Sequence, residues 1–146
     1  MRFFAVLDTN VLVSALLRKG SVPARILDEA ADGCIVPLFN DDILAEYEDV
    51  LRRKKFPFTE REIKAMIDGI RSRGAQVEAG PVDVAMPDLD DVVFYAVVME
   101  KRREDDAYLV TGNQKHFPKE PFIVTPKEML DIIEAGLHPQ NISQDE

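Results

Sequence analysis

Short apolar runs alternate with helical patterns along most of the chain, and this alternation restricts the possible folds more than any other feature. The runs that read as strands are RFFAVL, CIVPLF, AYLVT, FIVT and, more weakly, AQVE. Amphipathic helical patterns separate most of them. Strands that are joined through helices run parallel, so the sequence predicts an α/β fold whose central parallel sheet is covered by helices on both faces.

Capping residues mark where several of these helices begin. Ser21, Asn40 and Thr59 each stand directly before a helical pattern, where a side-chain oxygen can accept a hydrogen bond from the first turn. Pro126 occupies the first position of the last helix, which suits its fixed φ and its missing N–H. Local chemistry therefore predicts these helix starts independently of the fold.

The composition is that of one globular domain. The chain has 146 residues, of which 46% are hydrophobic and 31% are charged, and no repeat or linker divides it. We expect a single domain over residues 1–136 and a polar tail at 137–146. The single cysteine, Cys34, excludes an internal disulfide and suits a reducing cytoplasm, and no apolar run approaches the length of a membrane span.

Polar residues stand at the predicted ends of two strands. In AVLDTNVLVSALL, Asp8 follows the first strand and interrupts an apolar run, and Asn113 follows the AYLVT strand. Glu46 lies at the margin of the apolar stripe of its helix, and Asp91 opens another helix. Ligands of a parallel sheet collect beyond the carboxyl ends of its strands. We therefore expect these four residues to converge at that edge.

Several carboxylates at one edge of a sheet suggest a metal site. They repel each other at neutral pH, and a hard cation such as Mg²⁺ removes this repulsion, takes oxygen ligands and activates water towards a phosphodiester. The chain has no Gly-rich phosphate loop, no Cys/His spacing for zinc and no Gly-x-Ser-x-Gly elbow. His116 is expected to be a loop residue rather than a general base.

Each of these residues also has a purely structural interpretation. Asp8 can cap the helix that begins at Asn10, and one acid of the DLDD segment can cap its own helix. Asn113 can be a turn residue, and Glu46 can be a partly exposed helix residue. Capping needs one polar residue per helix, however, and does not require another helix to supply a second carboxylate.

Four stretches together resemble the PIN domain family: LDTNVLVSALL, LAEYEDVLRRKKF, PDLDDVVFYA and LVTGNQKHFP. More narrowly, they are similar to the bacterial group described as toxin components of toxin–antitoxin systems. The resemblance extends from Phe3 to about Gly136. It implies a three-layer α/β/α fold with a parallel sheet of four or five strands, and a ribonuclease, acting as an endoribonuclease, that depends on Mg²⁺ or Mn²⁺.

The resemblance also assigns site residues. The family's acidic site carries over to Asp8, Glu46 and Asp91 as metal ligands and to Asn113, and all four are expected to be catalytic. The supporting positions are Thr9, Asn10, Thr111, Asp88 and Asp90. Many relatives have Asp where this chain has Asn113, whose amide lacks the charge and lowers the expected metal affinity. Asp88 or Asp90 is placed to compensate for it.

The net charge of −9 opposes binding to a polyanion such as RNA. Residues 52–73 are an exception, with eight basic residues against three acidic ones. The cluster that begins this stretch is the candidate for contact with the RNA backbone: Arg52, Arg53, Lys54 and Lys55. A charge run of this kind can also be a solvated helix end.

The resemblance makes RNA the expected substrate and an antitoxin protein or a second copy of the chain the expected partner, without a membrane. The alternative is a non-catalytic RNA-binding or protein-interaction module that keeps the fold, which Asn113 and the net acidity favour. A small-molecule phosphatase is disfavoured, because Asn10 stands where that chemistry needs a second Asp.

Overall fold

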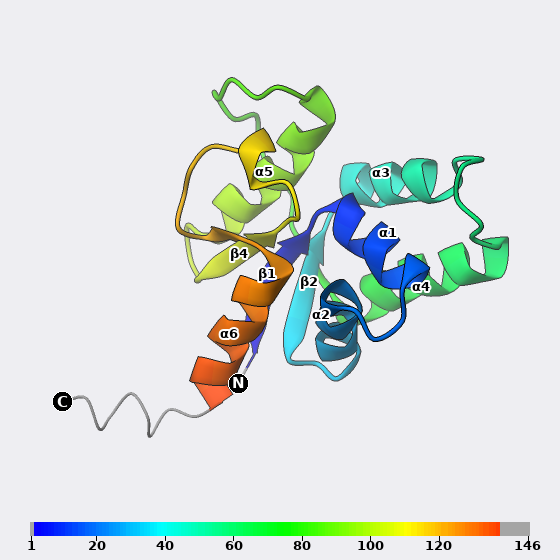
Figure 1. Ribbon diagram of the computed structural model, residues 1–146. Coiled ribbons are helices and arrows are strands. Elements are labelled where there is room, and N and C mark those ends of the chain that lie inside the picture. The colour runs from blue at the N-terminus through cyan, green and yellow to red at the C-terminus, as the bar shows by residue number, and fades with distance from the viewer. Residues whose placement is uncertain (1, 138–146) are drawn as a thin grey trace.

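The computed structural model describes residues 2–137, and a five-stranded parallel sheet forms its centre (Figure 1). The strands are β1 (Phe3–Leu7), β2 (Ile35–Phe39), β3 (Ala75–Gln76), β4 (Ala107–Val110) and β5 (Ile123–Val124). They lie in the order β3-β2-β1-β4-β5, and every neighbouring pair is parallel. The predicted polar tail lies outside the described residues, apart from its first residue.

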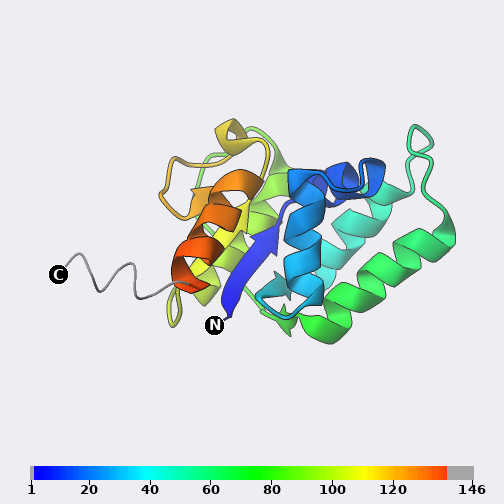
Figure 2. The ribbon, with the colours of Figure 1, turned by 60° about the horizontal axis from the view of Figure 1, so that its bottom comes forward.

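Helices cover both faces of this sheet. They are α1 (Thr9–Leu17), α2 (Val22–Ala31), α3 (Asp41–Leu51), α4 (Glu60–Arg73), α5 (Leu89–Lys101) and α6 (Pro126–Leu137). Figure 2 shows α2, α4 and α6 on one face and α5 on the other. The predicted α/β/α fold with a parallel sheet is therefore confirmed. No helix in residues 2–137 is long and apolar enough to cross a membrane.

The helix starts follow the predicted capping chemistry. Ser21 Oγ accepts a hydrogen bond from the Ala24 amide, and Asn40 Oδ1 accepts one from the Ile43 amide. Thr59 and Glu62 form a capping box at the start of α4, in which each side chain accepts from the other residue's backbone N–H. These caps fix where α2, α3 and α4 begin.

Strand β1 is the central strand and brings distant parts of the chain together. Ala5, Val6 and Leu7 are fully buried, and β1 pairs with β2 on one side and β4 on the other. Leu7 is in register with Val110 of β4, and the amide of Asp8 donates to the Val110 carbonyl at 2.9 Å. The residues that follow β1 and β4 are therefore direct neighbours at the carboxyl edge of the sheet.

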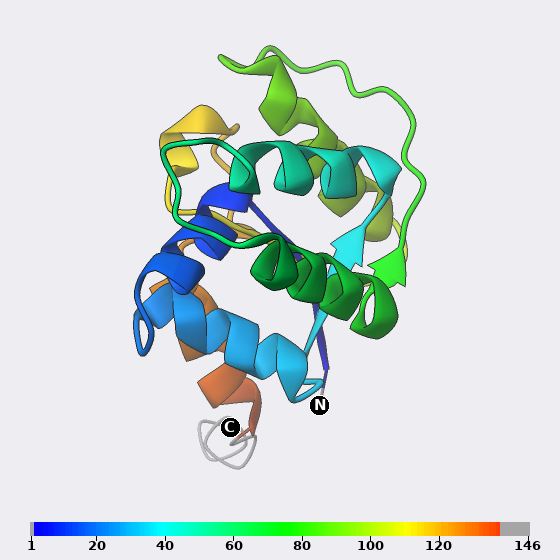
Figure 3. The same ribbon diagram turned by 90° about the vertical axis from the view of Figure 1, so that its right-hand side faces the viewer.

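A long connection without helix or strand joins β3 to α5 (Figure 3). Val82, Val84 and Met86 are half-buried and pack against the core, whereas the residues between them are exposed. The segment AGPVDVAMP is thus a loop whose alternate apolar residues pack against the core. It returns the chain from the edge strand to the start of α5, where Asp88, Asp90 and Asp91 lie.

Candidate metal-binding active site

Asp8 stands between β1 and α1 at the carboxyl edge of the sheet. It occupies the N-cap position of α1, but its side chain makes no capping hydrogen bond. Its Oδ2 instead accepts hydrogen bonds from Thr111 Oγ1 at 2.7 Å and from Asn10 Nδ2 at 3.1 Å. Burial raises the pKa of the Asp8 carboxyl, and the bond from Thr111 partly opposes that shift. The acid in the apolar run is thus held by the side chains of Thr111 and Asn10, and the backbone amides of Thr9 and Asn10 also oppose the rise of its pKa.

The turn after β4 supplies the partners of Asp8. Thr111 is fully buried and follows the last residue of the strand. Its Oγ1 also accepts a hydrogen bond from the amide of Asn113 at 2.9 Å, and the amide of Gly112 donates to Asn10 Oδ1 at 3.2 Å. Asn113 is exposed, and Thr111 links its backbone to Asp8.

Asp91 lies in the first turn of α5 and is only 9% exposed. Burial, followed by the negative charges of Asp8 and Asp88, raises the pKa of Asp91 to about 6. Its buried Oδ2 receives no hydrogen bond from the described residues. Asp8 and Asp91 therefore come from different elements, act on each other electrostatically and are both poorly solvated.

Glu46 lies on α3, half-buried, beside the other acids of α5. Burial raises the pKa of Glu46, and the charges of Asp90, Asp49 and Asp88 add to the shift. Asp88 itself caps α5 by accepting a hydrogen bond from the amide of Asp90 at 2.9 Å. One acid of the DLDD segment is thus the predicted cap. Glu46 faces this capping segment, and Asp88 is the charge that acts on both Glu46 and Asp91.

Tyr47 fixes the position of α3 against the site, a role that the sequence reading did not assign. Its buried hydroxyl donates to the carbonyl oxygen of Leu7, the residue before Asp8, at 2.5 Å. Its ring stacks on Phe94 of α5 with centroids 6.0 Å apart. Tyr47 is one of the buried residues of α3. A buried tyrosine hydroxyl usually needs a partner, and this need was the available signal.

His116 is the second residue near the site that sequence reasoning missed. It ends η1 (Gln114–His116), a 3₁₀ turn inside the predicted loop after β4. Its Nδ1 lies 3.4 Å from Asp91 Oδ2, within ion-pair distance. The signal that could have found it is its place three residues after Asn113, in the same strand-end turn.

The residues present fit a divalent cation that is held by two carboxylates. No group of three or more His, Cys, Asp or Glu side chains within residues 2–137 is close enough to hold a metal jointly. Mg²⁺ is commonly bound through only one or two carboxylates and keeps several waters. Asp8 and Asp91 would supply such a pair, and the buried Oδ2 of Asp91 receives no hydrogen bond within residues 2–137. Thr9 Oγ1, in the residue after Asp8, is a second buried oxygen that has no hydrogen-bond partner among the described residues.

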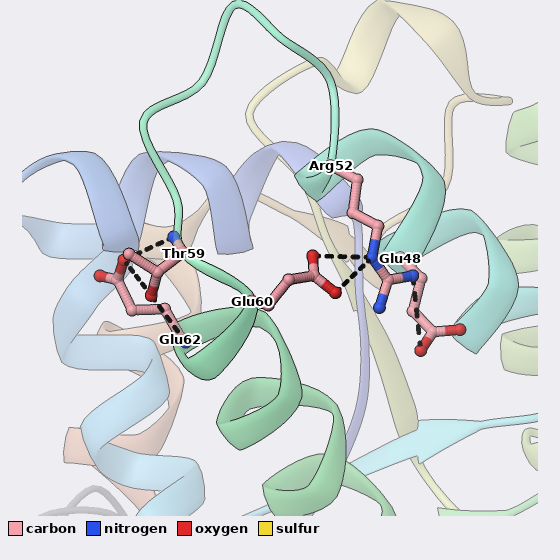
Figure 4. A network of polar contacts seen from close by, with 5 residues as sticks. All are labelled: Glu48, Arg52, Thr59, Glu60 and Glu62. Carbon is pink, nitrogen blue, oxygen red and sulfur yellow. Dashed lines mark hydrogen bonds and ion pairs between the residues drawn. The ribbon is translucent and has the colours of Figure 1, made fainter.

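The predicted RNA-contact cluster is already partly neutralised by acids. Arg52 pairs with Glu60 of α4 at 3.0 Å and approaches Glu48 at 3.9 Å, as Figure 4 shows. Arg53 pairs with Asp49 at 3.5 Å. No ion pair with another described residue is formed by Lys54 or Lys55, although the ammonium of Lys55 lies 5.2 Å from the ring centroid of Phe56. The four bases are therefore not equivalent.

Comparison with known proteins assigns the family. The PIN domain model matches residues 5–115, a range that covers most of the chain and includes Asp8, Glu46, Asp91 and Asn113. No curated protein matches the sequence significantly. PIN domains are generally nucleases. The parallel sheet, with Asp8 at its carboxyl edge, agrees with this match. Because the family model covers most of its length, the chain belongs to the PIN domain family.

Proposed function

We propose that the protein is a divalent-metal-dependent endoribonuclease that hydrolyses phosphodiester bonds in RNA. The observation that carries the proposal is the pair Asp8 and Asp91. These carboxyls come from distant parts of the matched segment, are both buried and both have raised pKa values. Two buried acids that disfavour each other's charge destabilise the fold when no cation is bound. The same two acids form a suitable site for a cation.

Each residue has a distinct part in this proposal. Asp8 and Asp91 would hold Mg²⁺ or Mn²⁺, and Thr111 and Asn10 fix the Asp8 carboxylate in one orientation. When bound there, the ion offsets the charge of the phosphodiester and acidifies an attacking water. Glu46 stands on the side of Asp88 and Asp90, where it can orient water or a second ion. In this scheme the amide of Asn113 adds a neutral oxygen and leaves the charge to the acids.

The biological setting is part of the same proposal. We place the reaction in the cytoplasm, where the lone Cys34 stays reduced. Resemblance to toxin components supports a role as the toxin of a toxin–antitoxin pair, with an antitoxin protein as partner. A second copy of the chain is the other proposed partner.

Cleavage of a mixed RNA pool by the purified protein tests the activity. We expect cleavage with Mg²⁺ or Mn²⁺, none with EDTA, and none by Asp8→Asn with either metal. Asp49→Asn is the matched control, because it removes the same charge from an exposed position. Cleavage that persists in EDTA, or an active Asp8→Asn protein, would contradict the proposal.

A non-catalytic RNA-binding module is the second candidate. It is favoured by the exposed, uncharged Asn113 and by the lack of a ready-made three-ligand group among residues 2–137. In that case the wild-type protein binds RNA in a gel-shift assay but leaves it intact with every divalent metal.

A further inference from the structure

The carboxylate of Asp91 has one uncommitted oxygen, Oδ2, and one polar side chain stands next to it. This atom is buried and receives no hydrogen bond from the described residues. Nδ1 of His116 lies 3.4 Å away, close enough for an ion pair but outside hydrogen-bond geometry. The imidazole is half-exposed, so it has room to rotate about its side-chain bonds towards this oxygen. Catalytic contacts are often longer before substrate and ligands assemble.

The backbone that carries His116 is anchored on both sides. Before it, Gln114 Nε2 donates to the carbonyl of Ile123 in β5 at 2.9 Å and to Glu128 of α6 at 3.2 Å. After it, Phe117 is 7% exposed and belongs to the hydrophobic core. The imidazole is therefore presented to Asp91 by a fixed turn and not by a freely moving loop.

The same turn also holds Asp8. Thr111 begins it and donates to Asp8, whereas His116 ends it and faces Asp91. A single segment after β4 thus contacts both carboxylates, although Asp8 and Asp91 are more than eighty positions apart in the sequence. This arrangement ties the relative orientation of the two acids to one rigid element.

We propose that His116 is a positioning residue, whose Nδ1–H holds Asp91 Oδ2 so that Oδ1 is turned towards the divalent cation. The proposal rests on the proposed function, because it assigns His116 a role in building that metal site. His116 acts through Asp91 and does not touch the reacting phosphate. Ligating carboxylates that are oriented by a hydrogen bond bind metal more tightly, and loss of such partners typically weakens metal binding by roughly 10–100-fold.

Three substitutions separate the two ring nitrogens. In His116→Asn, the amide nitrogen reaches about the place of Nδ1, so the contact to Asp91 is kept. In His116→Gln, the amide nitrogen reaches about the place of Nε2, so the contact is lost, as it is in His116→Ala. Lys115→Ala is the matched control, because Lys115 is an exposed neighbour in the same 3₁₀ turn.

Mn²⁺ affinity, measured by electron paramagnetic resonance without RNA, is the primary readout. We expect the dissociation constant to rise roughly tenfold or more in His116→Ala and His116→Gln, and to stay within about twofold of wild type in His116→Asn and Lys115→Ala. At limiting Mn²⁺, kcat for RNA cleavage should fall in the same order, with KM for RNA unchanged.

The outcomes distinguish this proposal from the proposed function. A wild-type protein that binds no Mn²⁺ and cleaves no RNA overturns both. Wild-type binding and cleavage, together with an unchanged Mn²⁺ affinity in His116→Ala, overturn only the role of His116. Retention of affinity by the Gln variant and its loss in the Asn variant also reject the contact through Nδ1. Circular dichroism of each variant verifies that the fold is kept.

Discussion

Thr111 and Asp8 are joined by a 2.7 Å hydrogen bond from Oγ1 to Oδ2, across 103 positions of the sequence. The bond exists because β1 and β4 are adjacent and in register, so that the residues that follow them meet at the edge of the sheet. Thr111 also accepts from the amide of Asn113. Its hydroxyl is therefore both donor and acceptor in the site.

Thr111→Val should destabilise the protein. The substitution keeps the shape of the side chain but removes the hydrogen bond from Thr111 to Asp8 and leaves the Asn113 amide without its acceptor. A buried polar group without a partner costs about 1–3 kcal/mol, and urea unfolding at pH 7 measures the change. Thr111→Ser keeps the hydroxyl and should lose much less of the unfolding free energy. Equal stability of the Val variant and wild type would show that the bond contributes nothing.

Asp91→Asn should stabilise the metal-free protein at neutral pH. The pKa of Asp91 is about 6 in the folded protein, against 3.8 for the ordinary group, so the folded state binds more protons between these values. Stability from protonated Asp91 is therefore complete below about pH 4 and is lost as the pH rises through about 6. The amide variant stays neutral and avoids this loss.

Urea unfolding in EDTA from pH 4 to pH 8 measures that difference. The advantage of Asp91→Asn over wild type should be near zero at pH 4 and should grow until the pH exceeds 6. Asp49→Asn, at an exposed position, should show a much flatter difference. An Asp91→Asn protein that is less stable than wild type at pH 8 would mean that the carboxylate is favourably paired in the fold.

Mn²⁺ should reverse this order of stability. Since binding to the folded state alone adds RT ln(1 + [L]/Kd), a concentration of about 100 times Kd raises the unfolding free energy by roughly 2.7 kcal/mol. We expect the wild type and Asp49→Asn to melt at higher temperature with Mn²⁺, and Asp8→Asn and Asp91→Asn to show little change. Stabilisation of all four proteins to the same extent would place the ion elsewhere.

The elements of the fold could be predicted because their signals are local. Apolar runs marked the strands, and Ser21, Asn40 and Thr59 marked helix starts whose caps the structure confirms. The strand ends likewise indicated that Asp8 would stand at the carboxyl edge of the sheet. These inferences needed only neighbours in sequence and the general geometry of parallel sheets.

The contacts between elements could not be predicted in the same way. Whether Tyr47 reaches Leu7, or His116 reaches Asp91, depends on the rotation of a helix and the path of a turn, which no local pattern specifies. The charge count over residues 52–73 included Glu60 but could not show that it pairs with Arg52, because that contact depends on α4 packing beside α3. Sequence gives the charges, and packing decides which of them remain unpaired.

This pairing separates the four bases at the end of α3 into two kinds. Arg52 and Arg53 already pair with acids, whereas Lys54 and Lys55 form no ion pair with the described residues. A phosphate that binds an arginine must compete with a carboxylate, and one that binds Lys54 or Lys55 breaks no ion pair with the described residues. The lysines should therefore contribute more of the electrostatic attraction to RNA.

Replacing Lys54 and Lys55 by Gln should weaken binding of single-stranded RNA and flatten its salt dependence, by roughly 0.7 units of log–log slope per lost phosphate contact. The matched variant Arg52→Gln/Arg53→Gln removes the same charge and should change the slope less. Affinities at several salt concentrations, measured with Asp8→Asn protein, which the proposed function predicts to be inactive, test both. A larger effect of the arginine pair would mean that RNA displaces their acids. Two unchanged slopes would identify the cluster as a solvated helix end that RNA does not contact.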